Sequence, residues 1–222
     1  MKPLTHSADK NHPRELLAWC MYDWANSVFT LVISTAIFPI YYYSVAPDTV
    51  QFLGQSVARE SMRSYAIAIA YILILLFNPY LGGLADSRHL KKFFLMSTCY
   101  IGAIASCGLY FFDESSGGLG VLLFILGAFF FANRGAVFNS FLPDIATEDK
   151  FDSLSAKGFS MGYLGSSILL FVSLLMITFA DSIGISKGEA TRISFLMTGI
   201  WWAAFGSLTF LVLRERKSAS QN

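Results

Sequence analysis

A short loop joins two long apolar segments of the chain and reads Asn78-Pro79-Tyr80-Leu81-Gly82-Gly83-Leu84-Ala85-Asp86-Ser87-Arg88-His89-Leu90-Lys91-Lys92. Its glycines stand where two helices must approach closely, which a residue without a side chain permits. One carboxylate, Asp86, follows at a predicted helix end, and three cations come after it. The loop is too short to form a domain, so we expect it to connect two neighbouring helices.

The composition places these helices in a membrane. Apolar residues make up 55% of the chain and charged residues only 14%, which is typical of proteins that cross a bilayer several times. Six segments are long enough to span as helices, which takes about 20 residues each. The sequence therefore predicts an all-α membrane protein with an arm over residues 1–16, a six-helix bundle over 17–213 and a polar tail over 214–222. The predicted spans are 17–43, 65–84, 93–112, 119–142, 155–179 and 192–213.

The lysines and arginines gather on one side of the predicted membrane. If the start of the chain is cytoplasmic, eleven of them fall in inner segments and four in outer ones. Because cytoplasmic loops carry an excess of positive charge, we expect both termini in the cytoplasm. The inner residues are Lys2, Lys10, Arg14, Arg88, Lys91, Lys92, Lys150, Lys157, Arg214, Arg216 and Lys217, and the outer ones are Arg59, Arg63, Lys187 and Arg192.

Histidines are absent from the predicted spans, since His6, His12 and His89 all lie outside them. Haem ligation, intramembrane metal sites and serine–histidine proteolysis usually need a buried histidine. The chain also has no nucleotide-binding loop of the kind that drives primary transport. We therefore expect no enzyme activity, no cofactor, no metal and no nucleic-acid partner, and we expect the lipid bilayer and a small solute as partners.

The first span carries a polar stripe made of Asp23, Asn26, Ser27, Thr30 and Ser34. Their spacing puts them on one face of a helix. A stripe facing lipid would leave polar groups in hydrocarbon, so it must face other helices or water. Hydrogen bonding between helices and the lining of a solute path are both open for the hydroxyls. The carboxylate favours the path, because a buried charge is a costly structural device.

Arg134 is the natural partner of Asp23. It lies in the fourth span at a depth similar to that of the carboxylate, and an unpaired arginine there would be strongly unfavourable. Two roles are open for the pair, a permanent clamp between helices or a contact that opens when a solute or proton binds. We favour the second, because charges within a membrane more often mark pathways. Asn133 extends the same polar surface.

The six spans divide into two groups of three, as in transporters built from inverted repeats. The first helix of each group carries a similar tripeptide, Ala25-Asn26-Ser27 in one and Ala132-Asn133-Arg134 in the other. We therefore predict two three-helix inverted repeats.

The loop after the second span resembles the signature loop of the major facilitator superfamily. Gly82 and Asp86 have the spacing of that signature, and Lys91 and Lys92 supply its closing cations. The basic residue expected directly after the aspartate is displaced by one place to Arg88, and the second glycine is missing. The superfamily fold has twelve spans in two halves, so the resemblance implies a secondary transporter of which this chain is the amino-terminal half.

Three further motifs resemble the vacuole-effluxer-like branch of that superfamily. They are Tyr22–Ser27 in the first span, Phe141–Ala146 after the fourth and Gly158–Gly165 in the fifth. Fungal members of the branch are associated with amino-acid efflux from the vacuole. The resemblance thus implies amino acids or similar small metabolites as solutes, in the inner membrane of a bacterium or the vacuolar membrane of a fungus.

The resemblance also implies roles for particular residues. A transporter of this kind alternates access by rocking two six-helix bundles around a site between them. The first and fourth helices would line the path through Asp23, Asn26, Thr30, Asn133 and Arg134. A cytoplasmic gating loop would comprise Gly82, Asp86, Arg88, Lys91 and Asp144, as a latch of alternating charges. The second six-helix half would be a missing carboxyl-terminal half, a separate chain or a second copy.

A different class of function is also open. The chain could be a non-transporting membrane scaffold or regulatory subunit whose helices pack through glycine faces such as Gly158, Gly162 and Gly165. The Asp23–Arg134 pair would then be structural. Movement of solute by the purified protein in liposomes distinguishes the two hypotheses.

Overall fold

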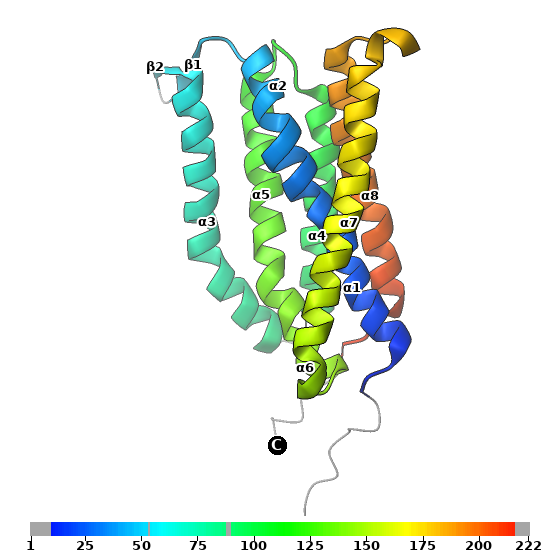
Figure 1. The fold of residues 1–222 in the computed structure, drawn as a ribbon. Helices are drawn as coiled ribbons and strands as arrows, with labels where there is room; N and C mark the ends of the chain where they lie inside the picture. Colours follow the sequence, from blue (N-terminus) through cyan, green and yellow to red (C-terminus); the bar gives the residue numbers. More distant parts are fainter. Residues whose placement is uncertain (1–9, 53, 88–89, 216–222) are drawn as a thin grey trace, which may run out of the picture.

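The protein is a helical bundle with one small β-hairpin. The computed structural model describes residues 10–52, 54–87 and 90–215. In this part of the chain, six helical segments are long and apolar enough to cross a membrane, which confirms the predicted six long apolar helices. Figure 1 shows them side by side, with both ends of the described chain at one end of the bundle. We call it the terminal end and the opposite end the hairpin end.

The first span consists of three consecutive pieces. Helix α1 (Pro13–Val28) leads into a π-helical segment, η2 (Phe29–Ile37), which leads into α2 (Phe38–Val45). Pro13 suits the start of α1, because the first helical position needs no amide donor. The predicted arm 1–16 therefore overlaps this helix, and its residues 1–9 lie outside the described residues. Figure 1 shows the span crossing the bundle at a tilt.

A β-hairpin lies in the connection between the first two predicted spans, residues 44–64. Strands β1 (Thr49–Phe52) and β2 (Gln55–Ala58) pair antiparallel, with Thr49 opposite Ala58. Helix α3 (Arg59–Ser87) follows directly and contains Pro79. Figure 1 shows α3 bending in its lower half. Pro79, in the second half of this helix by sequence, removes a backbone donor and accounts for a bend.

The remaining helices alternate between the two ends of the bundle. They are α4 (Lys91–Gly108) with η3 (Leu109–Phe111), α5 (Gly117–Ser140), α6 (Leu142–Ile145), η4 (Glu148–Lys150), α7 (Phe151–Thr178), η5 (Ala180–Ile183) and α8 (Lys187–Val212). Helices α7 and α8 begin before the predicted spans, because their first turns are polar and lie outside the apolar stretch. Ser186 caps α8 by accepting a hydrogen bond from the Glu189 amide at 3.1 Å.

The turn between η3 and α5 is held by a carboxylate. Ser115 and Ser116 donate hydrogen bonds to Asp113 at 2.7 and 2.8 Å, and these bonds lower the pKa of that carboxyl below its ordinary value. The turn therefore gains from the ionised form above the ordinary pKa, and the gain is lost as the pH falls through the lowered pKa. We expect the protection factors of the amides at residues 114–117, which are corrected for the intrinsic pH dependence of exchange, to fall on acidification, and Asp113→Asn to remove this fall. A pH dependence that persists in the variant would contradict this account.

Glycines set two close helix contacts inside the bundle. Gly158, Gly162 and Gly165 of α7 lie buried against α1, which confirms the predicted packing role of this glycine face. Helix α8 approaches α4 in the same way, because a Cβ on Gly199 would lie 2.5 Å from the Ala103 carbonyl oxygen. Trp202 is fully buried, and a side chain on Gly102 would strike its ring. This tryptophan therefore packs between helices.

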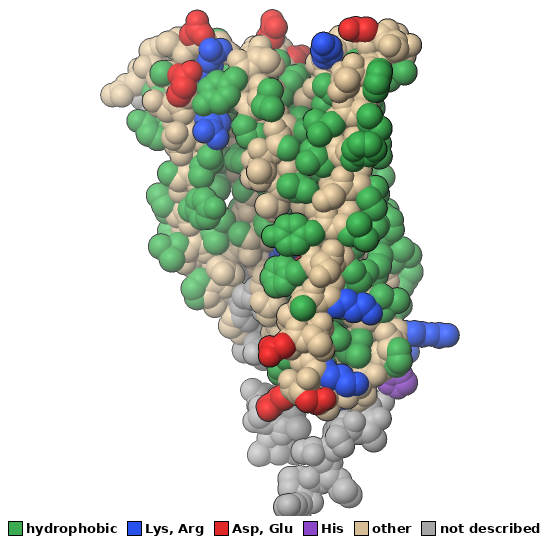
Figure 2. All heavy atoms as spheres, in the orientation of Figure 1, with side chains coloured by type: hydrophobic (Ala, Val, Ile, Leu, Met, Phe, Trp, Pro, Cys, Tyr) green, Lys and Arg blue, Asp and Glu red, His purple; other side chains and the backbone are tan. Residues whose placement is uncertain are grey.

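The bundle surface fits a bilayer. Figure 2 shows hydrophobic side chains over the length of the visible face, with acidic and basic side chains gathered at its two ends. Large apolar side chains are exposed on the second and fifth spans, including Leu75 and Tyr80 of α3 and Phe171 of α7. In water such a surface would drive aggregation, whereas lipid chains solvate it.

Candidate functional site

An ion pair lies inside the apolar layer between the first and fourth spans. Asp23 of α1 and Arg134 of α5 approach to 3.6 Å between Oδ1 and Nη1, and their side chains are only 10% and 12% exposed. The structure thus brings together the two charges that the sequence paired. At this distance the contact is electrostatic rather than a close hydrogen bond, so the two groups can separate without breaking a tight one.

Aromatic rings surround the arginine. The guanidinium carbon of Arg134 lies 4.5 Å from the centre of the Phe131 ring and 5.8 Å from that of Phe138. Ring faces attract cations, and this attraction partly replaces lost hydration. Phe138 also stacks on Trp19 of α1 at 4.3 Å, and the Trp19 indole donates to the Phe138 carbonyl at 3.2 Å. These contacts hold the two spans together beside the pair.

Two buried asparagines flank the pair in matching conformations. Asn26 donates to the Tyr22 carbonyl at 2.6 Å, and Asn133 donates to the Phe129 carbonyl at 2.8 Å, each four residues back in its own helix. The amide oxygen of each, and Nε of Arg134, make no hydrogen bond to the described residues. Buried polar atoms usually have partners. The site therefore offers one donor and two acceptors that the fold leaves unused.

Helix α7 makes room for the carboxylate. A Cβ on Gly158 would lie 2.6 Å from Oδ2 of Asp23, and one on Gly162 would lie 2.5 Å from Oγ of Ser27. The glycine face thus does more than allow helix packing, because any side chain at Gly158 would displace the acid. Nothing in the sequence connected this face to Asp23.

Thr30, the remaining residue of the predicted path, lies apart from the buried pair. It sits in η2 with an exposed side chain, and it makes no hydrogen bond to the described residues. Asn26 and Asn133, by contrast, are almost fully buried. The predicted stripe therefore changes from buried to exposed along the first span, and its role as a path stays a prediction.

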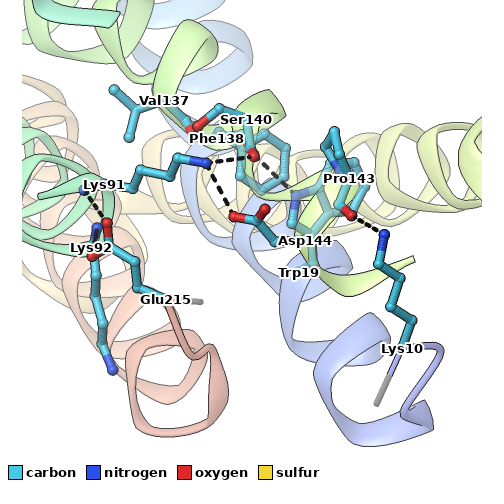
Figure 3. Close-up of polar contacts among 10 residues, drawn as sticks. All are labelled: Lys10, Trp19, Lys91, Lys92, Val137, Phe138, Ser140, Pro143, Asp144 and Glu215. Atoms are coloured by element: carbon cyan, nitrogen blue, oxygen red, sulfur yellow. Dashed lines mark hydrogen bonds and ion pairs between the residues drawn. The ribbon is translucent and has the colours of Figure 1, made fainter. Parts of the chain in front are cut away.

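A second polar cluster lies at the terminal end. Lys91, the first residue of α4, donates to Oδ2 of Asp144 at 3.0 Å and to the Ser140 carbonyl at 3.2 Å. Figure 3 shows its ammonium reaching across to the end of the fourth span. The structure thus brings together two of the predicted gating residues. Gly82 and Asp86 belong to α3, but the side chain of Asp86 is not described. Arg88 lies outside the described residues.

Glu215 joins this cluster and was missed in the sequence. Its carboxylate accepts hydrogen bonds from the backbone amides of Lys91 at 2.9 Å and Lys92 at 3.3 Å (Figure 3). It thereby caps α4, where a negative charge is favoured. Lys10 reaches the Pro143 carbonyl at 2.6 Å in the same view. We call Lys10, Lys91, Pro143, Asp144 and Glu215 the terminal-end cluster.

Asp144→Asn is expected to destabilise the terminal-end cluster. The change removes the charged acceptor of Lys91, whose side chain is only 9% exposed, so the loss should be about 1–3 kcal/mol. Thermal melting of the protein in detergent measures it. Asp149→Asn is the matched control, because Asp149 is exposed in the short η4 segment. Equal melting temperatures for Asp144→Asn and wild type would show that the ion pair contributes nothing.

Six apolar spans with an ion pair buried between two of them are typical of membrane transport proteins. The comparison with known proteins specifies which kind. The chain belongs to the family described as vacuole effluxer Atg22 like, whose sequence profile matches residues 11–222. It is thus a multi-pass membrane protein of the transporter type rather than an enzyme, in the major facilitator superfamily.

Individual relatives agree with this assignment. The chain is 31% identical over 198 residues to the uncharacterized MFS-type transporter YxiO of Bacillus subtilis (strain 168), a match covering 88% of this chain and 46% of that protein. It is 22% identical over 203 residues to autophagy-related protein 22-1 of Phaeosphaeria nodorum, covering 75% of this chain and 36% of that protein. The chain therefore spans less than half the length of these relatives. No solved structure matches it.

Proposed function

We propose that the chain forms one six-helix half of a secondary transporter that moves a small solute by alternating access. The observation that carries this proposal is the Asp23–Arg134 pair, which is buried in the apolar layer but separated by 3.6 Å. A purely structural clamp would gain most from close, fully bonded geometry. A pair that must open in each transport cycle gains from looser geometry with unused donors and acceptors beside it.

The arrangement of spans supports two inverted repeats. The first span packs against α7 and α8, the fifth and sixth spans, and α5, the fourth span, packs against α3 and α4, the second and third. Exchanging the two groups of three helices converts one set of contacts into the other. Asn26 and Asn133 occupy corresponding places and bond in the same way. In this arrangement the Asp23–Arg134 pair lies between the first helices of the two repeats.

The positive charges support an orientation with the terminal end in the cytoplasm. Of the described residues, those at this end are Lys10, Arg14, Lys91, Lys92, Lys150, Lys157 and Arg214, and those at the hairpin end are Arg59, Arg63, Lys187 and Arg192. Because cytoplasmic loops carry an excess of cations, this distribution favours the cytoplasmic side for the terminal end. The terminal-end cluster would then be the cytoplasmic latch of the transporter.

A second six-helix unit would complete the transport path. The relatives are more than twice as long as the part of them that this chain covers, which leaves room for such a unit. The unit could be a carboxyl-terminal half, a separate chain or a second copy. Within the transporter, the exposed hydroxyl of Thr30 would face the path between the two units.

The charges of the site support amino acids as its solutes. An amino acid carries one carboxylate and one ammonium group, and Arg134 and Asp23 present the opposite charge to each. The unused amide oxygens of Asn26 and Asn133 can accept hydrogen bonds from the ammonium. Such a solute could enter the pair without leaving either charge uncompensated, which keeps the electrostatic cost of binding low.

Proteoliposomes test this proposal. The chain would be purified alone and after co-expression with the remaining half of YxiO, and each preparation would be reconstituted into liposomes. The liposomes would be loaded with a mixture of radiolabelled amino acids, and efflux would be compared with that from liposomes without protein. We expect radiolabel to leave the liposomes that contain the chain with its YxiO half. An excess of unlabelled amino acid inside the liposomes should slow this efflux by competition. If neither preparation moves any amino acid, yet the helices assemble stably, the membrane scaffold is the better description.

A further inference from the structure

The first span contains a π-helical segment of nine residues, η2, in the middle of its length. Its hydrogen bonds reach one residue further back than in an α-helix, as in the bond from the Phe38 amide to the Ile33 carbonyl. No other helix of the described residues contains such a segment. π-Helical turns are rare and are frequent at functional sites. The sequence predicted one continuous helix over residues 17–43.

Pro39 explains why the α-helix fails here. Proline has no amide hydrogen, and in an α-helix its ring strikes the carbonyl four residues earlier, that of Thr35. The wider π turn before the proline relieves this contact. Because the Phe38 amide bonds to Ile33 and Pro39 has no amide hydrogen, the Ser34 carbonyl receives a bond from neither. The backbone is thus underbonded at the end of η2.

The hydroxyls of η2 are also unused. Elsewhere in the spans, several Ser and Thr side chains donate to the carbonyl four residues back, as Ser106 does to Gly102 at 2.9 Å and Thr198 to Ser194 at 2.8 Å. The side-chain hydroxyls of Thr30, Ser34 and Thr35 make no hydrogen bond to the described residues. Few polar contacts therefore fix this segment. A change in its helical register would break no hydrogen bond of these three hydroxyls.

Both flanks of η2 are anchored. On the hairpin side, Phe38 stacks on Phe124 at 4.3 Å and Tyr41 donates to the Phe112 carbonyl at 2.9 Å. On the terminal side, Trp19 bonds to Phe138, and Asp23 pairs with Arg134. A weakly bonded segment between two anchored ones is where a helix can turn or bend.

A chain of rings connects η2 to the ion pair. Phe29, the first residue of η2, stacks on Phe131 at 5.7 Å, and Phe131 lies under the Arg134 guanidinium at 4.5 Å. The Phe29 ring also fills the space beside Gly127, where a Cβ would lie 2.5 Å from it. A displacement of Arg134 would therefore move the ring on which Phe29 rests.

We propose that Phe29–Ile37 is the hinge of the first span, where π-type and α-type hydrogen bonds exchange as the Asp23–Arg134 pair opens and closes. Exchange by one residue rotates the flanking helices relative to each other by about 100°, the turn per residue of an α-helix. The coupling to transport rests on the proposed function, whereas the exchange itself does not. Helix register shifts of this kind take microseconds to milliseconds.

Amide hydrogen exchange of the protein in lipid nanodiscs tests the hinge. In the wild type, we expect residues 30–38 to exchange at least about tenfold faster than residues 162–170 in the middle of α7. Pro39→Ala restores the missing amide and favours a continuous α-helix, so it should slow exchange at 30–38 about tenfold or more. Pro79→Ala in α3 is the matched control and should leave residues 30–38 unchanged.

The link to the ion pair has its own readout. Arg134→Gln should change exchange at residues 30–38 several-fold, whereas Lys157→Gln, an exposed charge on α7, should not. Protection of residues 30–38 equal to that of α7 would overturn the hinge, as would an unchanged rate in Pro39→Ala. If Pro39→Ala does not fold, the wild-type comparison still decides. A mobile segment in a protein that moves no solute would reject the proposed function and leave the hinge standing.

Discussion

Arg134→Gln is expected to abolish solute movement while the protein still inserts into the membrane. The change leaves the Asp23 carboxylate buried in the apolar layer without its counter-charge, because Arg134 is the cation 3.6 Å from it. Removing one partner of a buried pair typically costs about 3–5 kcal/mol. The change also removes the cation–π contact between position 134 and Phe131. Radiolabelled efflux and thermal melting in detergent measure the two effects.

The reciprocal and double variants separate a structural role from a transport role. Asp23→Asn alone should abolish transport as well, and it should destabilise the protein by a similar amount. The double variant with Asp23→Asn and Arg134→Gln removes both charges together, so we expect it to melt closer to the wild type than either single variant does. It should still move no solute, because the two neutral side chains cannot form ion pairs with the charged groups of a zwitterion.

Lys157→Gln is the control for loss of charge as such, because this lysine is exposed on α7. It should melt and transport like the wild type. Transport retained in both Asp23→Asn and Arg134→Gln would refute the role of the pair in the path. A double variant as unstable as the singles would show instead that the two residues hold the bundle by separate contacts.

The sequence predicted the spans and the ion pair for related physical reasons. A helix in hydrocarbon satisfies its own backbone, so a long apolar stretch has few alternatives to a spanning helix. A charge in the same layer has equally few alternatives, and Asp23 and Arg134 were the clear opposite charges placed there. In both cases the alternative structures cost so much free energy that the local sequence is enough to predict the one that forms.

The details that the sequence missed depend on tertiary contacts. The polar stripe was placed with α-helical spacing, which does not hold through η2, and within the stripe Asn26 is buried whereas Thr30 is exposed. Pro39 indicates that the α-helix is disturbed near this position, but the sequence does not show that the disturbance is a π-helical segment. That segment forms where Phe38 packs on Phe124 of another helix. Glu215 stands among other charged residues in the sequence, and only the three-dimensional fold brings it to the start of α4.

Gly199→Ala is expected to destabilise the bundle more than a change of one methyl group suggests. The new Cβ would lie 2.5 Å from the Ala103 carbonyl oxygen and 2.8 Å from the Cys107 amide nitrogen, both in the backbone of α4. A flexible side chain could move aside, whereas two packed helices can separate only together. Overpacking of this kind costs about 1–3 kcal/mol, and thermal melting in detergent should record the loss.

The matched control reverses the sign of the effect. Gly135 also lies inside a helix, α5, but a Cβ there would meet no atom within 4 Å. Gly135→Ala should therefore stabilise the protein by up to about 1 kcal/mol, because alanine loses less backbone freedom in a helix than glycine does. Equal shifts in the two variants would mean that helix propensity alone governs both. Opposite shifts would locate the constraint in the contact between α4 and α8, the third and sixth spans that join the two proposed repeats.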